Sequence, residues 1–215
     1  MPARKPAPGA PKSVETDHLG LERLIFFSDA VFAIAITLLA IDIRLPETET
    51  PLTDARLVQT VLSLWPQYLS YCISFLVIGL FWIGHHRKFR FIQRYDTNLL
   101  MLNILMLMLV AFVPFPTSIL SAYGTQAATI LYAAFMLALG LVNLAIWWYA
   151  ARHNRLIDPH FDPRWRRRET LRAASVPAVF AFSIALAFLN ADVAKFSWIL
   201  VAAILQLAGA PRGEA

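Results

Sequence analysis

The sequence predicts an all-α membrane protein whose chain crosses the bilayer six times, and three observations support this prediction. The 215 residues are 58% hydrophobic and only 15% charged, whereas soluble domains have about 45–50% apolar and about 25% charged residues. The apolar residues are concentrated in long runs, and Lys and Arg are concentrated in alternate segments between those runs. A soluble core of this size could not bury so much apolar sequence, so lipid is the expected solvent for much of it.

The N-terminal residues 1–20 are polar and rich in proline, without the apolar segment of a signal peptide. We expect them to form a disordered cytoplasmic tail. The first span is predicted at 24–43, because twenty mainly apolar residues in a helix cover about 30 Å, the thickness of the hydrocarbon layer. The transmembrane domain is expected to cover residues 21–210.

Three more spans are predicted at 58–83, 98–121 and 127–150. Pro114 and Pro116 are expected to kink the far end of the third span. The fourth ends in three aromatic residues, 147–149, which are typical of the membrane interface.

Two shorter apolar runs, 173–189 and 196–210, follow the strongly basic segment 151–172. Each is close to the minimum length for a crossing, so the alternatives are two further spans or a re-entrant pair. We count them as spans, which gives six in total.

The positions of Lys and Arg predict the orientation. Sixteen of the 19 basic residues lie in the N-terminal segment through Arg23, the second and fourth loops and the C-terminal segment, and three lie in the other loops. Because cytoplasmic loops carry an excess of positive charge, both termini are predicted to be cytoplasmic. We interpret the basic segment 151–172 as a loop attracted to anionic lipid, and we expect no nucleic-acid partner.

Asp29 is an ionisable residue six positions into the first span. At the centre of a membrane helix such a group costs about 2.5–3.5 kcal/mol, so it usually faces the protein interior and has a partner. The candidate partners are Arg23, Trp82, His85, His86 and Asn103. Two interpretations stay open, a set of hydrogen bonds that locks helices together or a relay for ions or protons.

An apolar stripe runs along the same helix. At 100° per residue Ile34, Leu38, Ile41 and Leu45 share one face, with Thr37 on its flank. Asp29 lies about 140° from Ile34 around that helix. Periodicity alone therefore predicts that the stripe contacts lipid or another helix, away from whatever Asp29 binds.

Enzymatic and metal chemistry have little support in the sequence. The single Cys72 cannot form an internal disulfide, and the adjacent His85 and His86 point in different directions on a helix, which disfavours a zinc site. The sequence contains no nucleophile elbow, P-loop or zinc-protease motif, and it also lacks the T-V-G-Y-G filter of ordinary potassium channels. We expect no catalysis, no metal site and no organic cofactor.

The segment from Arg23 to Leu39 contains the pattern R-x-x-x-F-S-D, with Phe27, Ser28 and Asp29 as its last three residues. This pattern resembles the signature that opens the first helix of the transmembrane protein 175 family. Residues 81–86 and the segment from Asn103 to residue 117 are similar to the second and third helices of its bacterial branch. The resemblance covers most of residues 21–120.

The resemblance implies a six-helix subunit that assembles as a homotetramer around a pore lined by the first helix. It implies that Arg23, Phe27, Ser28, Asp29, Trp82, His85, His86 and Asn103 hold helices together. It also assigns Ile34, Leu38 and Ile41 to a pore constriction, with the Thr37 hydroxyl near the ion pathway.

The predicted function is a potassium-selective or potassium-preferring channel in a prokaryotic inner membrane, which conducts passively through a hydrophobic constriction. Its expected partners are potassium ions, membrane lipid and further copies of itself. The alternative is a proton-coupled secondary transporter or proton-permeable channel, in which Asp29 with His85 or His86 would form the relay. Internal repeats, common in transporters, are not evident in the sequence.

Overall fold

The computed structural model describes residues 12–46, 53–158 and 162–201, with side chains from residue 19 onward. Its elements are α1 (Lys12–Ile41), α2 (Asp54–Ser63), α3 (Trp65–Phe89), α4 (Thr97–Phe112), α5 (Pro114–Tyr123), α6 (Gln126–Ala151), a short 3₁₀ turn η1 (Arg152–Asn154), α7 (Pro163–Ala187) and α8 (Ala191–Ser197). Within these residues the fold is all-helical, apart from one isolated bridge between Ile92 and Ile157.

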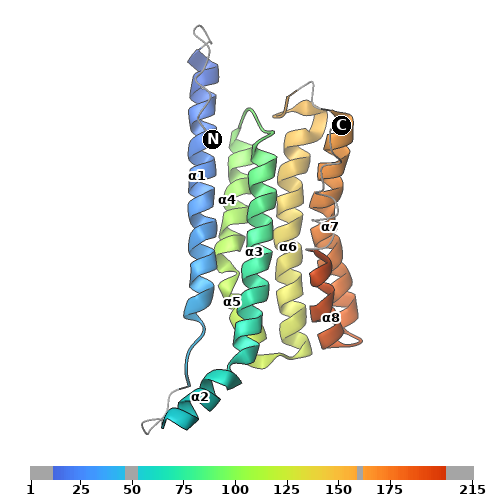
Figure 1. Cartoon of the computed structure of the whole chain (residues 1–215). Coiled ribbons are helices and arrows are strands. Elements are labelled where there is room, and N and C mark those ends of the chain that lie inside the picture. Colours follow the sequence, from blue (N-terminus) through green and yellow to red (C-terminus); the bar gives the residue numbers. More distant parts are fainter. Residues whose placement is uncertain (1–11, 47–52, 159–161, 202–215) are drawn as a thin grey trace, which may run out of the picture.

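The long helices stand side by side in a bundle, with α1 at one edge and α7 with α8 at the other (Figure 1). Five segments of the described chain are long and apolar enough to cross a membrane, namely Leu19–Ile41, Trp65–Phe89, Thr97–Tyr123, Gln126–Asn154 and Pro163–Ala187. The sixth predicted span, 196–210, lies mainly outside the described residues.

The first helix is longer than its predicted span. It begins at Lys12, so residues 12–20 are helical and not part of a disordered tail. The reason is visible in the sequence, because Pro11 is the last proline before Pro46 and Gly20 is a single glycine. One glycine inside a helix costs only about 1 kcal/mol and is tolerated.

The second predicted span, 58–83, is divided. A break at Leu64, two residues before Pro66, separates α2 from α3, and proline is favoured at the start of a helix because it has no N–H to leave unpaired. Helix α2 buries none of its residues. Helix α3 continues past the predicted end to Phe89 and brings His86 and Lys88 into its last turn, where positive charge is favourable near the helix carboxyl end.

The remaining helices follow the prediction more closely. The chain is interrupted at Val113, directly before Pro114, as the prolines indicate. Helix α6 agrees with 127–150 to within one residue at each end. Helix α7 begins ten residues before the predicted 173, because Asp162 caps its first turn and Pro163 occupies its first position. At 25 residues α7 is long and apolar enough to cross the bilayer.

Helices α6 and α7 pack against each other along their length. At their crossing, a Cβ atom on Gly140 would lie 3.1 Å from the ring of Pro177, so glycine permits the close approach. The connections α3–α4 and α6–α7 lie at the same end of the bundle (Figure 1). These are the two basic loops, so most of the positive charge of the described loops is at this end, which we call the basic end.

Candidate functional site

Helix α1 has two chemically distinct faces. One face is buried against the bundle, through Leu24, Ser28, Phe32, Ala35 and Leu39. Helices α3 and α4 supply most of this contact. The buried positions repeat every three or four residues, as expected for one face of a helix.

The other face carries the predicted apolar stripe. Ile34, Leu38 and Ile41 are 58%, 40% and 57% exposed in the single subunit, and Leu45 is also exposed. Thr37 is exposed beside them and donates its hydroxyl proton to the carbonyl of Ile34 at 2.8 Å. The stripe therefore points away from the helices of its own chain.

Asp29 lies at the edge of the buried face and pairs with α3. The indole N–H of Trp82 donates a hydrogen bond of 2.8 Å to the Asp29 Oδ1. The Trp82 ring in turn lies beside the ring of His86, with a distance of 5.8 Å between ring centres. The carboxylate of Asp29 thus has a hydrogen-bond donor from a second helix.

A second group of hydrogen bonds starts at Ser28, the residue before Asp29, and joins α1, α4 and α3. The Asn103 Nδ2 donates to the Ser28 Oγ at 3.0 Å, and Ser28 donates to the Leu24 carbonyl at 2.8 Å. The Asn103 Oδ1 lies 2.9 Å from the His85 Nε2. Because an amide oxygen can only accept, the Nε2 of His85 must carry the proton and donate.

The environment of His85 indicates a neutral ring. His85 stacks on Phe89 with 4.2 Å between ring centres, and Phe32 lies 5.7 Å away. Its Nδ1 is buried without a hydrogen-bond partner in the described part of the chain. A proton on this nitrogen would leave a second N–H without an acceptor, which is costly inside a protein.

Not all predicted anchor residues join these contacts. Within the described residues, no side-chain hydrogen bond connects the Asp29–Trp82 pair to the group formed by Ser28, Asn103 and His85. The side chains of Arg23, Phe27 and His86 are exposed in the single subunit. The structure therefore joins Ser28, Asn103 and His85 in one group of hydrogen bonds and Asp29 and Trp82 in another, with the His86 ring beside Trp82. Arg23 and Phe27 lie at the surface of the subunit.

A buried ionic cluster between α3, α6 and α7 was missed by the sequence analysis. The Lys88 ammonium donates to the side chain of Asn143 at 2.7 Å and to its carbonyl at 3.2 Å. Arg87 and Arg172 both pair with Glu169, whose side chain is fully buried. The available signals were Asn143 in an apolar run and Glu169 directly after three consecutive arginines.

A third polar group closes the basic end. Asp96 caps α4 through the Leu99 N–H, and it accepts hydrogen bonds from the Tyr149 hydroxyl and from Arg155. Burial alone would raise the pKa of Asp96, but the bonds from Tyr149 and Leu99 and the charge of Arg155 outweigh it and hold the pKa below its usual value.

The described residues contain no cluster of three or more His, Cys, Asp or Glu side chains that could hold a metal ion.

Comparison with known proteins gives consistent matches. A family model described as endosomal/lysosomal potassium channel TMEM175 matches residues 23–114. The chain is similar to a Streptomyces collinus protein named as a potassium channel, with 39% identity over 174 residues that cover 79% of this chain and 83% of the relative. A Chamaesiphon minutus protein, also named as a potassium channel, is 38% identical over 185 residues, with coverage of 84% and 88%.

The fold is also similar to a solved structure. The crystal structure of a lysosomal potassium-selective channel TMEM175 homolog from Chamaesiphon minutus superposes with a TM-score of 0.78 and 33% sequence identity. The match covers 89% of this chain and 99% of the other.

Proposed function

Because the chain belongs to the TMEM175 family of channels, we propose that it is a passive, potassium-selective or potassium-preferring channel of a prokaryotic membrane. The names of the two bacterial relatives support this proposal, since each is matched over most of its length. The single structural observation that supports it best is the exposed apolar stripe on a helix whose opposite face is fixed to the bundle. The matched family model and the Streptomyces relative both carry the name of an ion channel.

The pathway in this proposal lies between copies of α1. In a homotetramer, four copies of Ile34, Leu38 and Ile41 face one another and form a constriction. Such a ring closes by dewetting, because a cation that loses its water there finds no replacement ligands. The proposal is supported by the exposure of these large side chains in the single subunit, and the Thr37 hydroxyl lies beside the same pathway.

The hydrogen bonds on the opposite face of α1 are proposed to fix its rotation. Ser28 and Asp29 are consecutive, and they bind different helices, α4 and α3. A helix held at both residues cannot turn about its axis without breaking one bond. Arg23, Phe27 and His86 belong to this lock in our proposal through contacts with neighbouring subunits.

The proposed topology has six spans, both termini in the cytoplasm and the basic end of the bundle on the cytoplasmic side. Two observations disfavour proton-coupled transport. The hydrogen bond of Asp29 is separate from those of His85, and a second proton on His85 would have no hydrogen-bond acceptor among the described residues.

Planar-bilayer recording of the purified protein tests the function, with potassium on one side and sodium on the other. We expect ohmic single-channel currents with a reversal potential shifted toward the potassium equilibrium potential. A pH gradient without potassium should produce little current. Saturable flux that requires a proton gradient would contradict the proposal and support the transporter.

A further inference from the structure

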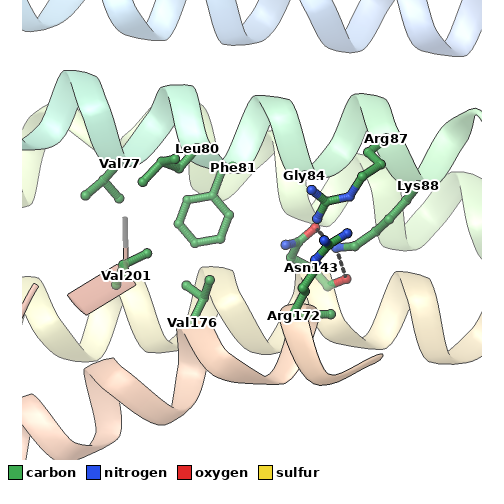
Figure 2. Close-up of a pocket in the computed structure, with 11 residues that line it drawn as sticks. Val77, Leu80, Phe81, Gly84, Arg87, Lys88, Asn143, Arg172, Val176 and Val201 are labelled. Atoms are coloured by element: carbon green, nitrogen blue, oxygen red, sulfur yellow. Dashed lines mark hydrogen bonds between the residues drawn. The ribbon is translucent and has the colours of Figure 1, made fainter. Parts of the chain in front are cut away.

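A pocket lies between α3 and α7, with α6 behind it. It changes in character along its length (Figure 2). Toward the middle of the bundle it is lined by Val77 and Phe81 of α3 and Val176 of α7. Toward the basic end it is lined by Arg87, Lys88 and Arg172. Figure 2 shows these three cationic side chains gathered around Asn143.

The cationic end of the pocket has an excess of positive charge. Arg87, Lys88 and Arg172 supply three positive charges, and Glu169 is the acid with which both arginines pair. The partner of Lys88 is the neutral Asn143. Two positive charges are therefore left over in this cluster, and Lys88 is only 2% exposed. Charges buried in this way normally have an opposite charge close by.

The same end of the pocket has hydrogen-bond donors that are not paired within the described residues. The Nε of Arg172 is buried and has no hydrogen-bond partner among the described residues. Lys88 donates two bonds to Asn143, and an ammonium has three donors. The pocket has a volume of about 20 Å³, which is room for one oxygen-sized group. An anionic oxygen fits both the size and the charge of this space.

We propose that this pocket binds an anionic phospholipid from the cytoplasmic leaflet. A phosphate oxygen enters the cationic end beside Arg172 and Lys88, and the rest of the headgroup remains outside. The acyl chains stay outside the pocket, which has room for one oxygen-sized group only. The anionic headgroup thus meets the cationic end of the pocket at the basic end of the bundle, where the cytoplasmic leaflet carries negative charge. The site requires the membrane orientation but does not depend on channel activity.

Gly84 provides a specific way to test the site. It lines the pocket, and an added Cβ atom would meet nothing within 4 Å, so a larger residue can be introduced at the pocket wall without a clash at its first carbon. Gly79 on the same helix has equally open surroundings and is not among the pocket residues. Gly84→Leu therefore blocks the pocket, and Gly79→Leu is the matched control.

The experiment is native mass spectrometry of the intact purified protein, titrated with phosphatidylglycerol and with phosphatidylcholine of the same acyl chains. We expect wild type and Gly79→Leu to bind phosphatidylglycerol about 25-fold more tightly, since each of the two uncompensated cations near the membrane contributes about a fivefold preference. Gly84→Leu should lose this preference. Arg172→Lys keeps the charge but removes the Nε donor, and should weaken phosphatidylglycerol binding several-fold.

Three results would overturn the proposal. Equal binding of the two lipids by wild type would mean that the pocket does not select an anionic headgroup, and that a water molecule satisfies the free donors of Arg172 and Lys88. Displacement of phosphatidylglycerol by millimolar inorganic phosphate would identify a site for free phosphate. If Gly84→Leu keeps the lipid preference but alters the oligomeric state, the pocket is a contact between copies of the chain.

Discussion

The indole N–H of Trp82 on α3 donates a 2.8 Å hydrogen bond to the carboxylate of Asp29 on α1. The bond connects residues 53 positions apart and ties the edge helix of the bundle to its neighbour. The bond gives the Asp29 carboxylate a hydrogen-bond donor inside the first span. The effect of removing this bond can be measured.

We expect Trp82→Phe to lower the stability by about 1 kcal/mol, because the ring remains while the donor to Asp29 is lost. In a chain of this size this corresponds to a fall of about 2–4 °C in the melting temperature. The measurement is thermal unfolding in detergent, followed by size-exclusion chromatography. Trp65→Phe, at an exposed tryptophan on the same helix, is the control, and an equal effect of both changes would refute the role of the bond.

Asn103→Leu should destabilise the protein by about 2 kcal/mol, because Asn103 bridges Ser28 and His85 and is itself fully buried. The corresponding fall in melting temperature is about 4–8 °C. Asn98→Leu on the same helix removes an exposed bond to Tyr149 and should cost much less. A similar loss in both variants would contradict the proposed lock.

Ile34→Asn should raise potassium flux through the channel, because an amide ring in place of the apolar ring holds water in the constriction. We expect an increase of tenfold or more in potassium release from loaded liposomes, corresponding to a barrier lowered by at least about 1.4 kcal/mol. Ile104→Asn, at an exposed residue of α4, should leave the flux at the wild-type rate. An unchanged flux in Ile34→Asn would refute the constriction.

Glu169→Gln should be among the most destabilising single changes, because it leaves Arg87 and Arg172 without their shared acid. Removal of one partner of a buried ion pair costs about 3–5 kcal/mol. Asp192→Asn breaks an exposed pair with Lys195 and should cost less than about 1 kcal/mol. Melting curves of both variants at neutral pH measure the difference, and equal curves would show that the cluster is not structural.

Asp96 predicts an acid-dependent loss of stability. Its pKa is lower in the folded state than in the unfolded chain, so its contribution is fully present above about pH 4 and disappears as the pH falls through the folded value. Asp96→Asn keeps a capping oxygen for Leu99 but does not titrate. Between pH 5 and pH 3 the melting temperature should fall less in this variant than in wild type, and parallel curves would contradict the prediction.

The sequence was sufficient to predict the helical class and the apolar stripe on α1, because hydropathy and helical periodicity encode them directly. It named Trp82, the hydrogen-bond donor to Asp29, only as one of five candidate partners. Helix ends were predicted less well. Pro66 divides the second span, and α7 extends into a basic segment that hydropathy alone excludes. In such a segment arginine side chains extend to the interface while their backbone remains helical.

The ionic cluster could not have been predicted in the same way. Its members come from three helices, and Arg87 and Glu169 are 82 positions apart in the sequence. Each charge taken alone is consistent with an exposed loop. Only the packing of α3 and α7 across α6 brings them together.

The two faces of α1 also have consequences for how such a channel can be engineered. The residues that fix the helix point inward, and those in the stripe are 40–58% exposed in the single subunit. Because we propose that Ile34, Leu38 and Ile41 form the constriction, we expect substitutions there to change conductance more than they change the folding of the subunit. An engineer can therefore vary these three positions in a library and select for different ionic preferences on one subunit fold.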